Sequence, residues 1–263
     1  MIDKEILEYY GHGLEQDRLA AGGRRIEFLR MRDLLERHLP PPPARVLDVG
    51  GGAGVYALPL AEAGYEVHLV DPVPLHVEQA AAAPLAGVTV GDARALEAAE
   101  DSADAVLLLG PLYHLTGKED RLAALREARR VARPGGVVIA KALSRLYPVF
   151  EALAGGRPPG PGEIEETARF LDDGQYRNPG GDPMGFTTSY FHRPEELAGE
   201  VREAGLELRA LVAVSGNVKL LPGIEQQMED AARRDHLLSV LRLVETEPSA
   251  VGMSQNFVAI TRA

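Results

Sequence analysis

The chain lacks cysteine altogether, although it is 263 residues long. Without thiols it cannot form disulfides, thiolate zinc sites or iron–sulfur clusters, and it has no thiol nucleophile. Long apolar runs are also missing, because no segment approaches the roughly 20 apolar residues that a membrane span requires. The first ten residues are acidic and lack the apolar core of a signal peptide. We therefore expect a cytoplasmic protein that does not insert into a membrane.

Basic charge is scarce as well. The net charge is −11, and only four of the 28 basic residues are lysines. A large nucleic-acid footprint needs a basic surface, so we expect no nucleic-acid partner. The seven histidines form no pair at metal-binding spacing, which predicts no metal site. A magnesium-dependent enzyme stays open as an alternative, without a motif to support it.

The most informative segment runs from residue 45 to residue 71. Its pattern predicts a strand over 45–49, a glycine-rich turn over 50–54, a helix over 55–63 and a second strand that ends at Asp71. Glycines let a backbone approach a ligand closely, and the N-terminus of a helix offers free N–H groups. An acidic residue at the end of the second strand can accept hydrogen bonds from a ribose. The segment therefore predicts a site for a nucleoside cofactor.

Two cofactors fit this segment, and an ordinary tight turn is the third reading. Gly52, Gly54 and Ala57 match the dinucleotide pattern G-x-G-x-x-G/A, and Asp71 follows at the expected distance. Asp48, however, stands just before the glycines at the carboxyl end of the strand, where a carboxylate would repel a pyrophosphate and attract a cation.

The segment also resembles motif I of the class I S-adenosylmethionine (SAM) methyltransferases, in which two apolar residues, Asp and a further apolar residue precede Gly-x-Gly-x-Gly. Further motifs of that family are matched by Asp71, by G-D-A-R at 91–94, by the segment 104–115 and by R-P-G-G at 133–136. The resemblance implies that SAM is the cofactor, with Asp48 near its cationic methionine part, Asp71 at the ribose hydroxyls and Asp92 at the adenine amino group. The cofactor-binding residues so implied are Tyr10, Asp48, Gly50, Gly52, Gly54, Asp71, Pro72, Asp92, Ala93 and Gly110.

Strands and helices alternate along the rest of the chain, which predicts a doubly wound, parallel α/β sheet. Further strands are expected at 87–90, 105–109, 137–143, 206–214 and 256–261, and helices at 73–83, 118–131, 194–204 and within 223–245. The resemblance implies a Rossmann-like sheet of seven strands whose last strand is antiparallel and lies between strands five and six. We expect a helical N-terminal lid at 1–43, a SAM-binding core at 44–143, an irregular cap inserted after strand five at 144–190, and the completion of the sheet at 191–263.

The turn after the fourth strand bears on the reaction. Gly110-Pro111-Leu112-Tyr113 stands where amino-methylating nucleic-acid enzymes carry Asn/Asp-Pro-Pro-aromatic, and glycine lacks the side-chain acceptor that such enzymes use. His114, in the same turn, is a candidate general base, because imidazole can take a proton from a hydroxyl or an amine near neutral pH. Packing within the turn is the alternative role, since proximity alone supplies much of the rate of methyl transfer.

Other candidate residues lie outside the motifs. Tyr113, His114, Tyr190 and His192 are expected to bind the acceptor, although the last two stand beside Thr187 and Phe191 in a cluster that a hinge packed on the sheet would also explain. Tyr9, Tyr10 and His12 precede the core, and Tyr10 is expected either to cover SAM or to make a plain amphipathic contact. Arg24 and Arg30 could reach the methionine carboxylate, or they could be surface charges.

Together these observations predict a methyltransferase that moves the SAM methyl group to an oxygen or nitrogen atom of a small molecule. An NAD-binding oxidoreductase and a non-catalytic SAM-binding module are the alternatives. The oligomeric state does not follow from the sequence.

Overall fold

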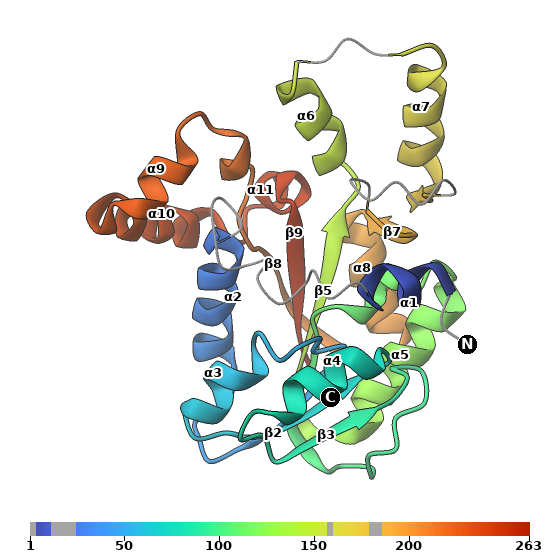
Figure 1. Cartoon of the computed structure of the whole chain (residues 1–263), viewed down its shortest axis with the longest axis vertical. Helices are drawn as coiled ribbons and strands as arrows, with labels where there is room; N and C mark the ends of the chain where they lie inside the picture. Colours follow the sequence, from blue (N-terminus) through green and yellow to red (C-terminus); the bar gives the residue numbers. More distant parts are fainter. Residues whose placement is uncertain (1–3, 12–24, 157–159, 179–185) are drawn as a thin grey trace.

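The computed structural model describes residues 4–11, 25–156, 160–178 and 186–263. Its centre is an open sheet with helices on both faces (Figure 1). Five parallel strands follow the order β3-β2-β1-β4-β5. Their bounds are Arg45–Val49 for β1, Glu66–Asp71 for β2, Gly87–Val90 for β3, Ala103–Leu108 for β4 and Ala132–Ser144 for β5. This order reverses between β1 and β4, so their carboxyl ends flank the place where open α/β sheets bind ligands.

The apolar strands form two hydrophobic cores because successive side chains point to opposite faces. On one face Val46 packs with side chains of α2 and α3, and on the other Leu47 packs with side chains of α5 and α8. The first face is covered by α2 (Arg25–His38), α3 (Ala57–Glu62) and α4 (Pro74–Ala81). The second face is covered by α5 (Lys118–Val131), α8 (Pro194–Glu203) and α11 (Pro248–Met253).

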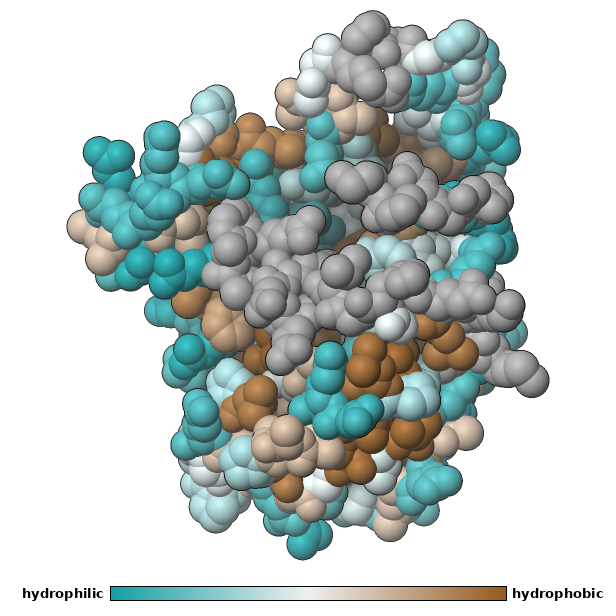
Figure 2. All heavy atoms as spheres, viewed as in Figure 1, coloured by the Kyte–Doolittle hydropathy of each residue, from teal (hydrophilic) through white to brown (hydrophobic). Residues whose placement is uncertain are grey.

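The C-terminal part completes the sheet as expected. Strand β9 (Asn256–Arg262) runs antiparallel to both β5 and β8 (Glu207–Ala213), which confirms a reversed last strand inserted beside strand five. Between them lie η3 (Val218–Leu220), α9 (Ile224–Glu229) and α10 (Ala231–Val244). These elements pack on Ile26 of α2 through a small separate core. They form the arm at the left of Figure 1, where hydrophilic side chains gather in the matching view of Figure 2.

The seven expected strands are confirmed as β1 to β5, β8 and β9, but the expectation of an irregular insertion was wrong. Within its described residues the insertion holds α6 (Tyr147–Ala154), α7 (Glu163–Asp173), β6 (Gln175–Tyr176) and β7 (Ser189–His192), and its two short strands bring the described sheet to nine. Its described glycines lie mostly outside the helices, as do Gly155, Gly156, Gly160 and Gly162, and so they separate elements rather than interrupt them. In addition, β5 extends beyond β4 and pairs there with β7.

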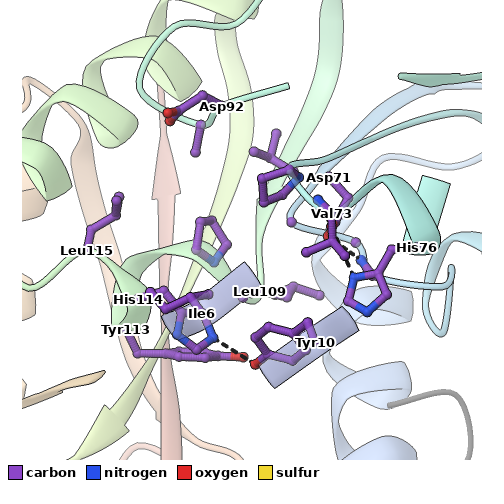
Figure 3. A pocket seen from close by; sticks show the side chains of 18 of the residues that line it. Ile6, Tyr10, Asp71, Val73, His76, Asp92, Leu109, Tyr113, His114 and Leu115 are labelled. Carbon is purple, nitrogen blue, oxygen red and sulfur yellow. Dashed lines mark hydrogen bonds and ion pairs between the residues drawn. The ribbon is translucent and has the colours of Figure 1, made fainter. Parts of the chain in front are cut away.

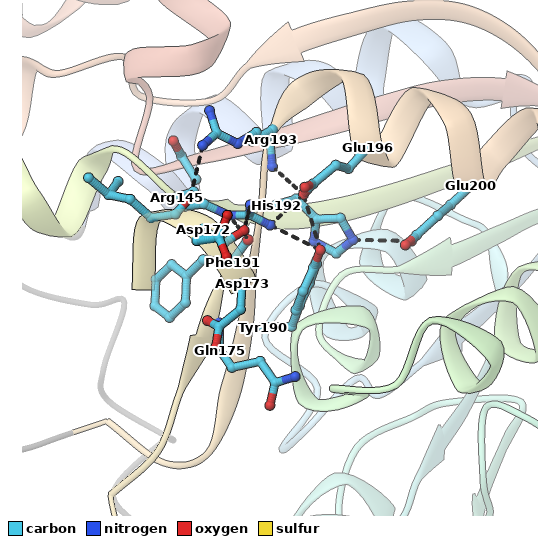
Figure 4. Close-up of polar contacts among 12 residues, drawn as sticks. Arg145, Asp172, Asp173, Gln175, Tyr190, Phe191, His192, Arg193, Glu196 and Glu200 are labelled. Atoms are coloured by element: carbon cyan, nitrogen blue, oxygen red, sulfur yellow. Dashed lines mark hydrogen bonds and ion pairs between the residues drawn. The ribbon is translucent and has the colours of Figure 1, made fainter. Parts of the chain in front are cut away.

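Arg145 connects the insertion to the end of β5 (Figure 4). Its guanidinium donates to the carbonyl oxygens of Phe191 (2.9 Å) and Asp172 (3.1 Å), and to the Tyr190 hydroxyl (3.0 Å). It also forms an ion pair of 2.6 Å with Glu196 of α8, and its side chain is only 2% exposed. The base of the insertion is therefore held by one buried charge with several partners, a type of contact that is costly to break.

Candidate active site

A cavity of about 310 Å³ opens at the carboxyl ends of β1, β2 and β4 (Figure 3). It brings together nine of the ten residues that the sequence assigned to the cofactor, namely Tyr10, Asp48, Gly50, Gly52, Asp71, Pro72, Asp92, Ala93 and Gly110. The tenth, Gly54, does not line the cavity, and a side chain there would face Leu58 and Ala80 instead. The motifs are far apart in the sequence, and the parallel sheet places their ends at one edge.

The floor of the cavity depends on two glycines in close contact. A Cβ atom at Gly110 would lie 2.9 Å from the carbonyl oxygen of Gly50, and a Cβ atom at Gly50 would lie 2.8 Å from Cδ of Pro111. Both distances are shorter than carbon contacts normally allow, and Gly50 also has a φ of 70°. The turns after β1 and β4 can therefore approach each other only without side chains at these positions.

Asp48 is the most unusual group in the cavity. Its side chain is 1% exposed, and neither carboxylate oxygen has a hydrogen-bond partner among the described residues. Burial, together with the nearby charge of Asp71, raises the pKa of Asp48 to about 7, whereas Lys141 acts in the opposite direction. A buried carboxylate without a partner is energetically costly. The site therefore favours a cationic guest that would supply the missing contact.

Asp71, by contrast, already has partners in the protein. Its Oδ2 accepts from the N–H of Gly52 (2.8 Å), and its Oδ1 accepts from the N–H of Val73 (2.9 Å). Nδ1 of His76 lies 3.0 Å from the same Oδ1. The carboxylate thus connects the glycine turn with the start of α4. Removing it would disturb both segments, so the loss of a ligand in such a variant would not isolate a role at the ribose.

Asp92 is held by a neighbouring cation. Arg94 donates to it from Nε and Nη2 and also reaches Asp120 through Nη1 at 3.0 Å. The hydrogen bonds from Arg94 lower the pKa of Asp92, so its carboxylate is ionised at neutral pH. At this end of the cavity the two carboxylates of Asp92 and Asp120 therefore share the single guanidinium of Arg94.

The short helix α1 (Lys4–Gly11) crosses the cavity from one wall to the other. The Tyr10 hydroxyl lies 2.8 Å from Nε2 of His114, and the Tyr10 ring contacts both His76 and His114 edge-on. Near the start of the helix, Glu5 accepts a hydrogen bond of 2.5 Å from the hydroxyl of Thr188. Helix α1 thus joins the wall that holds Asp71 to the wall formed by the insertion.

Tyr113 and His114 lie on the second wall, in the 3₁₀ helix η2 (Pro111–His114) that follows β4. Their rings are 4.6 Å apart, and the ring of Phe186 lies 5.8 Å from that of His114. Of these rings, those of Tyr113 and His114 border the cavity, across from Asp71 (Figure 3).

Tyr190 and His192 do not line the cavity. His192 is fully buried with Nε2 3.2 Å from Glu200, and burial lowers the pKa of its imidazole. The guanidinium of Arg121 lies 3.7 Å from the centre of the Tyr190 ring. The contact between His192 and Glu200 belongs to the polar network of Figure 4, and both contacts match the alternative of a hinge packed on the sheet. A role of either residue in binding an acceptor stays a prediction.

Other expectations have different outcomes. Arg30 is buried away from the cavity, where it donates to the carbonyl oxygen of Val214 and pairs with Asp33 and Glu245. Arg24 and His12 lie outside the described residues. Within the described segments, no group of three acidic or histidine side chains could hold a metal ion, and no helix has the length and apolar character needed to cross a bilayer.

Several cavity residues escaped the sequence analysis. Lys141, His76 and Thr188 all line the cavity, but none of them belongs to a recognisable motif. Lys141 alone carried a signal, because it is a single charge within the apolar run V-V-I-A-K-A-L of β5. A buried charge in a central strand needs partners, and that requirement marks it as a candidate functional residue.

Comparison with known proteins gives the site a family. Residues 47–140 match the family model described as a methyltransferase domain. A ubiquinone biosynthesis O-methyltransferase of Azorhizobium caulinodans is 30% identical over 197 residues, which cover 70% of each chain. A protein of the same name from Cereibacter sphaeroides is 31% identical over 184 residues, covering 66% of this chain and 64% of that protein. The matched part thus spans about two thirds of the length of these relatives.

A solved structure agrees with the fold. A SAM-dependent methyltransferase of Thermotoga maritima, described as a possible histamine N-methyltransferase, superposes with a TM-score of 0.58 over 98% of both chains. At 18% identity this likeness shows the fold alone. The relatives, however, match along two thirds of the chain, and the family model spans most of the motifs that form the cavity. The chain therefore belongs to the family of SAM-dependent methyltransferases, and SAM is its cofactor.

Proposed function

We propose that the chain transfers the methyl group of SAM to a hydroxyl oxygen of a small molecule. The observation that carries this proposal is that one cavity is lined both by the buried, unpartnered carboxylate of Asp48 and by the aromatic pair Tyr113–His114. The O-methyltransferase relatives support oxygen as the acceptor atom. The net charge of −11 supports a small molecule over a nucleic acid.

Each cofactor residue has a proposed part. Asp48 attracts the ammonium and sulfonium charges of SAM, and Asp71 accepts from the ribose while it holds the glycine turn in place. Asp92 and Ala93 bind the adenine, with Pro72 beside them, and the backbone of the glycine turn borders the methionine part. SAM, once bound, supplies an activated methyl group on a positively charged sulfur, so the protein needs chiefly to align the acceptor with it.

His114 is proposed to accept the proton of the acceptor hydroxyl. Its Nε2 lies 2.8 Å from the Tyr10 hydroxyl, so an acceptor that reaches this nitrogen must displace the hydroxyl. Lid and acceptor would then compete for one imidazole. The lid at 1–43 and the cap at 144–190 are proposed to select the acceptor, because Glu5 and Thr188 join them across the cavity.

The proposed activity is tested with SAM that carries an isotopically labelled methyl group. We expect label in hydroxylated aromatic or aliphatic acceptors, with one S-adenosylhomocysteine (SAH) formed per methylated product, as measured by mass spectrometry. Amines of matched size serve as the comparison set. Transfer only to amines would contradict the choice of oxygen, and SAH binding without transfer to any acceptor would favour a non-catalytic SAM-binding module. Tighter binding of NAD than of SAH would contradict the whole assignment.

Asp48→Asn should separate stability from binding. Because the pKa of Asp48 is raised in the folded protein, its ionisation destabilises the fold as pH rises from about 4 to 7. The SAM-free variant should therefore melt at a higher temperature than the wild type at pH 8, and the difference should vanish toward pH 4. Affinity for SAM should fall about ten- to a hundredfold, the usual effect of losing a charged hydrogen bond.

The matched control for this experiment is Asp101→Asn, which removes an exposed carboxylate outside the cavity. It should change neither the melting temperature at pH 8 nor SAM affinity by a comparable amount. If Asp48→Asn lowers the melting temperature at pH 8, the carboxylate stabilises the SAM-free protein. The proposal that Asp48 is an unpaired group that gains its partner only from a cationic ligand would then be wrong.

His114→Gln should leave SAH affinity within a few-fold of the wild type and lower turnover. Loss of a general base typically costs about 10²–10⁴ in rate, and the fall of turnover at acidic pH should disappear with the imidazole. Tyr10→Phe is the counterpart, because it removes the hydroxyl from Nε2 but keeps the base, so the acidic fall should persist. An unchanged pH profile in His114→Gln would refute the role of a base and leave only packing.

A further inference from the structure

Lys141 is a buried cation that borders the cavity and has no part in the function proposed above. Lys141 lies in β5 between the small residues Ala140 and Ala142, and only 3% of its surface is exposed. It is one of only four lysines in the chain. Burying an ammonium group is costly, so its place in the cavity wall calls for a reason in ligand binding or in structure.

Lys141 and Asp48 lie on the same face of the sheet. Asp48 pairs with Leu107, and Ala140 pairs with Leu108, so Lys141 is a short distance beyond Asp48 along the strands, with β4 between them. The alternation of side chains puts both on the face covered by α2, since Val46 and Ile139 belong to the core of that face. Their electrostatic coupling is direct, because the charge of Lys141 lowers the pKa of Asp48 against the effect of burial.

Glu27 of α2 orients the ammonium group. Nζ of Lys141 donates to Oε1 of Glu27 at 3.1 Å, while Nζ of Lys219 lies 3.4 Å from the other carboxylate oxygen. On the cavity side, Nζ of Lys141 lies 5.9 Å from the centre of the Tyr113 ring. An ammonium group has three donors in a tetrahedral arrangement, so a bond to Glu27 is compatible with a second acceptor on the cavity side.

The charges along the cavity are arranged by type. Among the described residues that line it, Arg94 and Lys141 are the two permanently cationic side chains. Arg94 serves Asp92 and Asp120 at the end assigned to adenine. Lys141 is thus the cationic side chain at the other end of the cavity, where Asp48 lies. A site of this kind presents a negative and a positive group to the same part of a ligand.

We propose that Asp48 and Lys141 together bind the amino-acid end of SAM, with the ammonium at Asp48 and the α-carboxylate at Lys141. This inference rests on the proposed SAM site. The amino-acid end carries both charges on one carbon atom, so an acidic site alone would attract its ammonium and repel its carboxylate. The pair fits both groups, and Lys141 becomes a residue that distinguishes the complete cofactor from analogues without the carboxylate.

The test uses three analogues and isothermal titration, so it does not depend on turnover. SAH has both charged groups, its decarboxylated form keeps only the amine, and 5′-methylthioadenosine lacks the amino-acid end. Wild-type protein should bind SAH at least tenfold more tightly than the decarboxylated form. Lys141→Met should lose about ten- to a hundredfold in SAH affinity, as expected for a charged hydrogen bond. Its affinity for the decarboxylated form should change no more than a few-fold.

Lys219→Met is the matched control, because Lys219 shares Glu27 but does not line the cavity. It should keep SAH affinity within a few-fold of the wild type. Equal losses for SAH and the decarboxylated form in Lys141→Met would overturn the proposal in favour of a structural role. Unchanged SAH affinity with a raised KM for the acceptor would overturn it in favour of an anionic acceptor.

The wild-type measurement stands even if Lys141→Met fails to fold. Equal affinity of the unaltered protein for SAH and its decarboxylated form would by itself contradict the proposal. Failure of the SAM site is a different result, because the wild type would then bind none of the three analogues.

Discussion

One buried carboxylate without a partner governs this site. Asp48 is the next-to-last residue of β1, a strand covered on both faces by hydrophobic cores, and nothing in the described part of the chain donates to it. Burial in the fold raises the pKa of this carboxyl group to about 7, so that it is only partly ionised at neutral pH. A cationic cofactor provides the charged partner that Asp48 lacks within the protein. Part of the binding free energy therefore comes from removing the cost of a buried, unpaired carboxylate.

The neighbouring elements make that arrangement possible. Gly50 and Gly110 let the turns after β1 and β4 meet backbone to backbone at the cavity. Asp71 ties the glycine turn to α4, and helix α1 closes the remaining side through Tyr10. Polar groups with protein partners thus surround a polar group without one. In this arrangement the site distinguishes ligands by their charge as well as by their shape.

Much of the framework could be predicted because its signals are local. The bounds of β1, β3 and α5 agree with the predicted 45–49, 87–90 and 118–131, since each is a short periodic segment ended by glycine, proline or charge. The glycine motif and the acidic strand ends predicted nine of the residues that line the cavity for the same reason. The insertion escaped prediction because its glycines and prolines resemble a coil, while pairing of β7 with β5 depends on residues more than 40 positions apart.

Residues whose role depends on contacts between distant elements were the harder ones. Lys141 gains its meaning from Asp48 across one strand and from Glu27 on a helix more than 100 residues away. Tyr190 and His192 looked like pocket residues because they form an aromatic cluster after an insertion. Their partners, Arg121 and Arg145 for Tyr190 and Glu200 for His192, belong to other elements and carry no local sign of that pairing.

The most direct test of this account is the number of protons released when SAH binds. Titration in two buffers of different ionisation enthalpy gives that number, because the observed heat contains the heat of the buffer in proportion to it. If Asp48 is about half protonated in the empty protein at pH 7 and becomes ionised beside the ammonium, about half a proton should be released at pH 7. The release should fall toward zero by pH 8 and be absent in Asp48→Asn. Binding without proton release at pH 7, or the same release in Asp48→Asn, would contradict the account.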